Sequence, residues 1–217
     1  MSKICTHFDE YFARHAGQIG ALCLLLCRDR KGADYAAFQS LLRLGGAKDP
    51  QIGDADARML LFSSAVRLCD DFYLKKMHRM PSRARLEAMG LHFPVTPALL
   101  SLMRLPFARR AALALFRFGF SLQEIAILLH KSEKHAQALI ADPDIPGWEE
   151  ALDSMLMTED QLLEMSDRIY ERFAERSVGV ENAIHDLRNA FDRAAPFLAL
   201  LALAICALAV WYVKTLA

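Results

Sequence analysis

A run of twenty residues near the end of the chain, AAPFLALLALAICALAVWYV at 194–213, carries no charged side chain between Arg193 and Lys214. A helix of this length rises about 30 Å, which is the thickness of the hydrocarbon core of a bilayer. We therefore expect residues 194–213 to form a single transmembrane helix. A buried core helix is the alternative, although such helices rarely run this long without a polar face.

Basic residues on the two sides of this run indicate its orientation. Arg188 and Arg193 precede the run, whereas Lys214 follows it. Because cytoplasmic flanks carry an excess of lysine and arginine, this bias favours a cytoplasmic N-terminal body. The sequence therefore predicts a single-pass, tail-anchored membrane protein.

The net charge of the whole chain is zero, but its charge is divided along the sequence. Residues 1–140 hold 20 lysines and arginines against 12 aspartates and glutamates, a net charge of +8. Residues 141–193 hold five basic residues against 14 acidic ones, a net charge of −9. A neutral chain thus contains a basic body followed by an acidic stalk.

Apolar residues recur at helical spacing and no stretch alternates clearly as a strand, which predicts an all-α protein. The third helix should begin at Asp54 or Asp56, either of which can cap it. The expected organisation is a helical domain at 1–80, a proline-marked linker at 81–103, a helix-turn-helix domain at 104–141, an acidic helical stalk at 142–193 and the transmembrane helix at 194–213.

The helix-turn-helix prediction depends on local start and stop signals. Pro106 can start a first helix that Gly119 ends, and Ser121 with Glu124 has the spacing of a capping box. His130 and Lys131 form the expected turn before a third helix, from Ser132 to about residue 141. This order of helices is typical of a helix-turn-helix, in which the last helix is the recognition helix.

The stretch LPFARRAALALFRFGFSLQEIAILLHKSEKHAQALI at 105–140 resembles region 4 of sigma-70-type factors of the extracytoplasmic-function group. The segments GADYAAFQSLL, within residues 8–44, and ARMLLFSSAVRLCDDFYLKK at 57–76 are similar to region 2 of that family. The resemblance spans about residues 8–141. It implies a two-domain helical fold that binds core RNA polymerase and promoter DNA.

The resemblance assigns polymerase binding to residues that fall on one expected helix, namely Asp34, Tyr35, Phe38 and Gln39. The alternative is a mixed helix face on which Phe38 belongs to the core and Asp34 is solvated. Both alternatives fit the pattern of the sequence alone.

The resemblance places DNA contacts on the recognition helix and the helix at the start of the motif; the candidates are Lys131, Ser132, Lys134, His135, Gln137, Arg109 and Arg110. Gln137 and Leu139 occupy positions where the family commonly carries basic residues. Because phosphate contacts supply most DNA affinity, we expect weak binding. Alternatively, this helical unit is a protein-docking surface.

The acidic stalk contains two amphipathic helical patterns, within residues 148–177, and the second is preceded by Thr158 as a possible cap. Amphipathic helices need a partner for their apolar side. The layout is similar to the cytoplasmic segment of membrane-bound anti-sigma factors. We hypothesise that the stalk folds over the basic body and holds it inactive; a spacer, a homodimer or contact with a partner protein are the alternatives.

Signatures of catalysis are missing from the sequence, which has no glycine-rich phosphate loop, no HExxH, no GxSxG and no histidine, cysteine and carboxylate cluster with metal-ligand spacing. We expect no enzyme activity, no cofactor and no metal. The predicted function is a membrane-tethered, sigma-like transcription regulator. The alternative is a membrane-anchored interaction protein that kept the fold but does not bind DNA.

Overall fold

A computed structural model of the protein describes residues 7–46, 51–75, 81–141 and 143–175. All regular secondary structure in these ranges is helical, which confirms the all-α class. Among the described helices, none is long and apolar enough to cross a membrane. The predicted transmembrane helix at 194–213 lies outside the described residues, as does most of the second unit into which the chain divides, residues 171–217 with residues 1–2. Residues 3–170 form the first compact unit.

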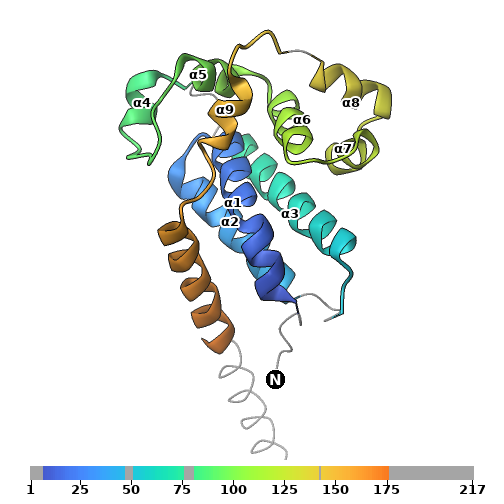
Figure 1. The fold of residues 1–217 in the computed structure, drawn as a ribbon, viewed down its shortest axis with the longest axis vertical. Coiled ribbons are helices and arrows are strands. Elements are labelled where there is room, and N and C mark those ends of the chain that lie inside the picture. The colour runs from blue at the N-terminus through green and yellow to red at the C-terminus, as the bar shows by residue number, and fades with distance from the viewer. Residues whose placement is uncertain (1–6, 47–50, 76–80, 142, 176–217) are drawn as a thin grey trace, which may run out of the picture. The chain divides into compact units, whose positions relative to one another are not determined.

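Three long helices form the first layer of this unit: α1 (Phe8–Cys27), α2 (Arg30–Gly45) and α3 (Asp54–Lys75) pack pairwise on one another (Figure 1). Their shared core is fully buried and includes Ile19, Leu25, Leu41 and Phe62. Arg28 adopts a left-handed conformation with φ of 53° and ends α1, and Asp29 then caps α2 by accepting a hydrogen bond from the Gly32 amide. These two residues therefore separate α1 from α2.

The segment predicted as a linker contains two short helices, α4 (Arg83–Glu87) and α5 (Pro97–Arg104). Pro97, one of the prolines that mark the predicted linker, stands in the first turn of α5, where a missing amide costs nothing. Thr96 caps α5 by accepting a hydrogen bond from the Leu99 amide at 3.1 Å. Residues 81–103 are therefore partly helical.

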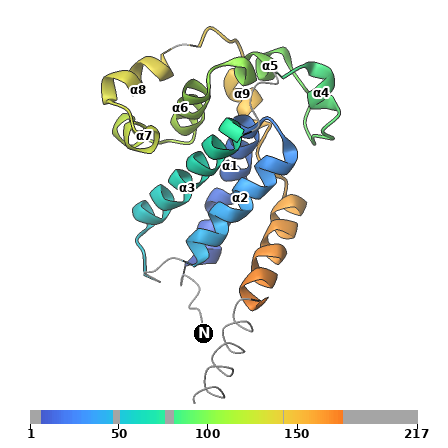
Figure 2. The same ribbon diagram turned by 180° about the vertical axis from the view of Figure 1, so that it is seen from behind.

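The helix-turn-helix consists of α6 (Phe107–Arg117), α7 (Leu122–Leu129) and α8 (Glu133–Ile140) (Figure 2). The capping box is confirmed: the Glu124 carboxylate accepts from the Ser121 amide at 2.8 Å, and the Ser121 hydroxyl oxygen accepts from the Glu124 amide at 3.3 Å. His130 makes the turn in a left-handed conformation with φ of 53°. The Lys131 amide then donates to the Ala126 carbonyl at 2.9 Å and ends α7.

Arginine side chains join the helix-turn-helix to the three long helices. Arg28 donates to the Leu105 carbonyl at 3.0 Å, and Arg58 donates to the Phe118 carbonyl at 2.8 Å. The Arg58 guanidinium also lies 3.7 Å from the centroid of the Phe120 ring, a cation–π contact. The two segments expected as separate domains, 1–80 and 104–141, are thus packed within one compact unit.

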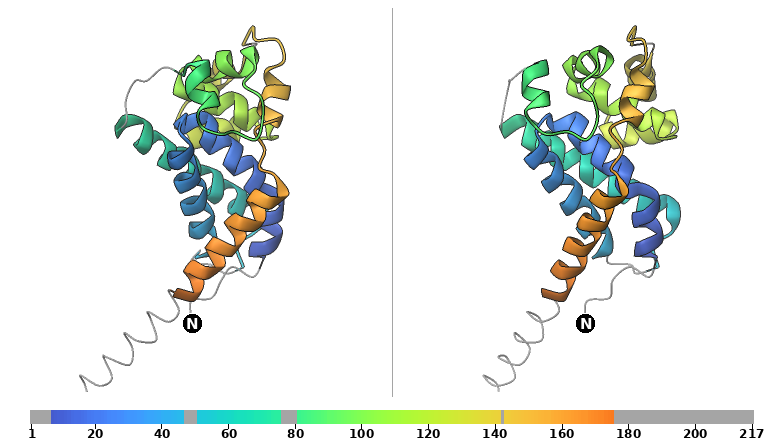
Figure 3. Two further views of the ribbon diagram at one scale, coloured as in Figure 1. Left: turned by 90° about the vertical axis from the view of Figure 1, so that its left-hand side faces the viewer. Right: turned by 60° about the vertical axis from the view of Figure 1, so that its left-hand side comes forward.

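The acidic stalk contributes α9 (Trp148–Asp153) and a further helix at 159–175. The expected Thr158 cap is confirmed, because its hydroxyl oxygen accepts a hydrogen bond from the Gln161 amide. We call residues 159–170, the part within the compact unit, the cover helix. Figures 1 and 3 show it, in orange, running alongside α1 and α2, whereas α9 lies against α5.

Candidate functional site

The predicted polymerase-binding residues lie on the outer side of α2. Asp34 and Tyr35 are exposed, and Phe38 and Gln39 are half-buried. Phe38 therefore does not belong to the closed core of the three long helices, where neighbouring positions such as Ala37 and Leu41 are fully buried. The four side chains form a surface, which we call the α2 surface.

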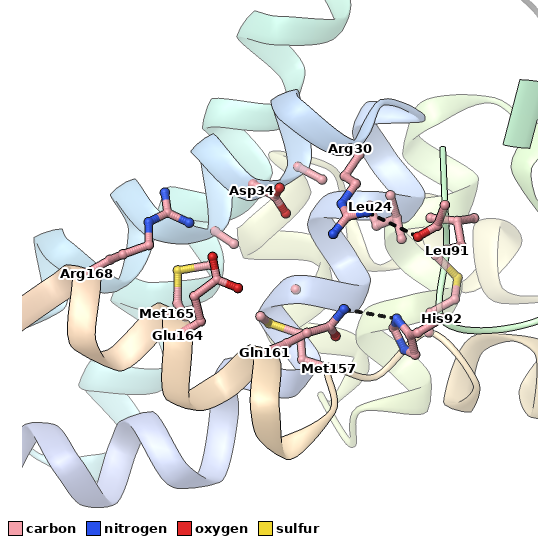
Figure 4. Close-up of a pocket in the computed structure, with 15 residues that line it drawn as sticks. Leu24, Arg30, Asp34, Leu91, His92, Met157, Gln161, Glu164, Met165 and Arg168 are labelled. Carbon is pink, nitrogen blue, oxygen red and sulfur yellow. Dashed lines mark hydrogen bonds between the residues drawn. The ribbon is translucent and has the colours of Figure 1, made fainter. Parts of the chain in front are cut away.

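The cover helix packs over part of this α2 surface. The guanidinium of Arg168 lies over the Phe38 ring, 5.1 Å from its centroid. Glu164 and Arg168 of the cover helix and Asp34 of α2 line the same small pocket (Figure 4). A protein that approached α2 at Phe38 would therefore meet the chain's own acidic stalk first.

Apolar side chains make up most of the buried contact of the stalk. Leu152 and Ile169 are fully buried, and Met155 and Met165 are almost so. On the opposite side of the cover helix Leu163 is 64% exposed. The apolar side of the described part of the stalk thus packs on the body of the chain within the same compact unit.

Just before the cover helix, the Met157 side chain approaches the backbone of α1 closely. Gly17 and Gly20 of α1 face the stalk at Met157, whose side chain lies directly over Gly20. A Cβ atom on Gly20 would come within 2.5 Å of the Met157 Cγ, so the flexible Met157 side chain would have to move. The absence of a side chain on Gly20 therefore lets the Met157 side chain lie against α1 in its present position.

Polar contacts hold the stalk at several further points. The Tyr170 hydroxyl donates to the Asp9 carboxylate, and the His92 ring contacts both the Leu156 carbonyl at 2.9 Å and the Gln161 amide. Arg117 of α6 pairs with Asp153 through two hydrogen bonds of 3.1 and 2.5 Å. These groups are largely exposed, so the opposite charges of body and stalk contribute less than the apolar contact.

Two titratable groups at this interface have shifted pKa values. Burial raises the pKa of Asp34, and the nearby Glu164 adds to that effect, while Arg30 and Arg168 oppose it. Burial, together with the hydrogen bond to Asp9, raises the pKa of Tyr170 to about 12. The carboxyl group of Asp34 therefore responds to whether the cover helix is in place.

The predicted DNA-contacting residues of the recognition helix share one exposed surface; these are Lys131, Ser132, Lys134, His135 and Gln137. Ala136 turns inward and is fully buried. The Ser132 hydroxyl oxygen accepts a hydrogen bond from the His135 amide and caps α8. Figures 1 and 2 show α8 on the far side of the compact unit from the cover helix, so the cover helix does not lie on this surface.

One of the two arginines predicted to assist DNA binding is placed differently from that prediction. Arg110 is fully buried and donates to the carbonyls of Met103 at 3.0 Å and Leu26 at 3.4 Å, so it cannot contact DNA. Spacing within α6 does not show this, because all residues from 110 to 115 are buried and one acceptor lies on α1. Arg109 is half-buried and donates to the Ala141 carbonyl at 3.3 Å.

A wide groove, which the sequence did not predict, lies between α3 and the end of α7. Its volume is about 970 Å³, and its lining includes Arg67 and Asp70 of α3 with Ile127 and Lys131. Ile127 is 57% exposed and offers an apolar contact beside these charged groups. The groove adds a second surface through which a partner could bind.

The described residues hold no group of three or more histidines, cysteines and carboxylates that could bind a metal. No protein family model, curated protein or solved structure matches the chain significantly.

Proposed function

We propose that this chain is a membrane-tethered, sigma-like transcription regulator that binds core RNA polymerase through the α2 surface and promoter DNA through α8. In the closed state, in which the cover helix lies on α2, the polymerase-binding surface is blocked. The observation that carries this proposal is the Arg168 side chain of the stalk lying over the Phe38 ring.

The cover helix would inhibit polymerase binding but not DNA binding. Arg168 of the cover helix lies over the half-buried Phe38 ring, whereas Lys131, Lys134 and Gln137 of the recognition surface are exposed. A closed molecule can therefore contact DNA weakly but cannot engage polymerase. Release of the cover helix is the step that turns the regulator on.

Residues 194–213 would hold the regulator at the membrane with its body in the cytoplasm. The stalk that blocks α2 is also the segment that joins the body to this anchor. An event at the membrane that moves the stalk could therefore free the α2 surface without any change in the body itself.

The alternative function is a membrane-anchored interaction protein that does not bind DNA. It is favoured by the groove of about 970 Å³ with its exposed Ile127, and by a recognition surface on which Lys131 and Lys134 are the only lysines or arginines among the five exposed candidates. In that case the cover helix would control access of a different protein to α2.

The experiment that tests the proposal is capture of purified core RNA polymerase by the full chain, kept in detergent and carrying Met165→Asp to release the cover helix. We expect capture, and we expect Tyr35→Ala in the same background to weaken it because Tyr35 is an exposed part of the α2 surface. Lys31→Ala, at an exposed α2 position outside that set, is the matched control. Failure of the released chain to bind polymerase would favour the interaction protein.

A further inference from the structure

A small pocket lies where the cover helix meets α2 and residues 90–92. Its volume is about 100 Å³, well below the roughly 300–1,000 Å³ of sites for drug-sized ligands. The pocket therefore suits only a molecule of a few heavy atoms. Figure 4 shows side chains from α1, α2 and the cover helix converging on it.

Charged groups of both signs face this pocket from its two walls. Arg30 and Asp34 come from α2, and Glu164 and Arg168 come from the cover helix. All four are close enough to interact, because Glu164, Arg30 and Arg168 each influence the pKa of Asp34. The pocket thus offers two carboxylates and two guanidinium groups around one small volume.

The four charged side chains around this pocket, Arg30, Asp34, Glu164 and Arg168, are exposed to solvent. Asp34 and Glu164 form no hydrogen bond or ion pair with another described residue, and the Arg168 guanidinium lies over the Phe38 ring. Arg30 donates through Nη1 to the carbonyls of Met89 and Gly90. Accessible groups of opposite charge around one small pocket are suited to a ligand that pairs with both signs.

The lining also selects against ligands of a single charge. A small anion would pair with the guanidinium groups but would lie against the carboxylates, and a small cation would meet the reverse problem. Leu24, Met157 and Met165 add an apolar wall of the kind that fits a short aliphatic group. A small molecule with an ammonium group, a carboxylate and a short aliphatic side chain matches all three features.

We propose that this pocket binds a small free α-amino acid, whose ammonium group pairs with Asp34 and Glu164 and whose carboxylate pairs with Arg30 and Arg168. Because one wall belongs to α2 and the other to the cover helix, the bound amino acid holds the cover closed. Binding itself is independent of the proposed function; only its consequence for polymerase depends on that function.

The test is calorimetric titration of the full chain in detergent with L-alanine, compared with propionate and ethylammonium, which each carry half of its charges. We expect saturable binding of L-alanine and binding of each half-ligand that is weaker by roughly tenfold or more, the effect of losing a charge-assisted pair. Asp34→Asn and Arg168→Gln should each weaken L-alanine binding by a similar factor. Asp167→Asn, an exposed neighbour on the same helix outside the pocket, should leave it unchanged.

A thermal unfolding midpoint that rises with L-alanine concentration in the wild type, but not in the Asp34→Asn variant, would support a site in the folded state. The proposal is overturned if helical wild-type protein shows no saturable L-alanine binding, or if propionate binds equally well. Polymerase takes no part in these measurements. A failed amino-acid titration is therefore distinguishable from a failed proposal for α2.

Discussion

Gly20 of α1 lies directly beneath the side chain of Met157, and this contact fixes where the stalk meets the body. A helix-interior glycine costs about 1 kcal/mol relative to alanine, so its presence in α1 calls for a packing reason. The Met157 side chain, which occupies the space that a Cβ atom would need, supplies that reason.

Gly20→Leu should therefore displace residues 155–157 and loosen the cover helix, because the new side chain takes the place of Met157. We expect faster amide hydrogen exchange across residues 159–170, with α3 remaining protected. Ala13→Leu, an exposed substitution on the same helix, is the control and should change neither segment. Unchanged exchange in the cover helix of the Gly20→Leu variant would show that this contact does not hold the stalk.

Asp34 makes the stability of the fold depend on pH. Its pKa is raised in the folded chain, chiefly by burial and less by Glu164, while Arg30 and Arg168 oppose the shift, so the folded chain binds this proton more tightly than the unfolded chain. The resulting stabilisation is present below the ordinary pKa of about 3.8 and is lost as the pH rises through the raised value. We expect the thermal midpoint of the wild type to fall over this pH range relative to that of Asp34→Asn. If the thermal midpoints of the two proteins changed with pH in parallel, the raised pKa of Asp34 would be contradicted.

The ion pair between Arg117 and Asp153 should contribute little to closure. The two side chains are 38% and 43% exposed, and exposed pairs contribute about 0–1 kcal/mol even with two hydrogen bonds. A double-mutant cycle with Arg117→Ala and Asp153→Ala should give a coupling energy within that range. Raising the salt concentration from about 0.05 to 0.5 M should leave the cover helix protected. Release of the helix by salt would mean that charge, and not apolar packing, holds it.

Substitutions at Arg110 and Lys134 should have separate effects, the first on the stability of the fold and the second on DNA binding. Arg110→Ala removes a buried guanidinium and leaves two carbonyls without their donor, so we expect a loss of about 2–4 kcal/mol in the free energy of unfolding. Lys134→Ala alters an exposed side chain, so it should leave stability unchanged and lower the salt dependence of DNA binding by about one counterion. Urea unfolding and fluorescence anisotropy with duplex DNA measure the two effects. Equal DNA affinity for wild type and Lys134→Ala would favour the interaction protein.

Local signals in the sequence predicted most of the helices correctly. The capping box at Ser121 and Glu124 is read from neighbouring residues, and the structure has it. The third helix begins where it was expected, but Asp54 is its first helical residue and the Gly53 carbonyl accepts from the Ala57 amide, so neither Asp54 nor Asp56 stands in the cap position. The two short helices at 83–87 and 97–104 were missed because the prolines near them were treated as breakers.

Features that depend on contacts between distant parts of the chain could not be predicted from local sequence signals. The inward direction of Arg110 is settled by carbonyls of α1 and α5, which no short window of sequence includes. The amphipathic pattern of the stalk indicated that it needs a partner but not which surface supplies it. Contact between Arg168 and Phe38 joins residues 130 positions apart, so only the folded chain reveals it.

The measurement that tests the central claim most directly is the affinity of core RNA polymerase for three forms of the full chain in detergent: wild type, Met165→Asp and Leu163→Asp. Met165 lies on the buried face of the cover helix, whereas Leu163 lies on its exposed face. The two variants therefore add the same charge on opposite sides of one helix. If the cover helix blocks α2, Met165→Asp should bind polymerase at least about tenfold more tightly than wild type, a difference of about 1.4 kcal/mol, and Leu163→Asp should match wild type. Equal affinity of all three forms would contradict the account.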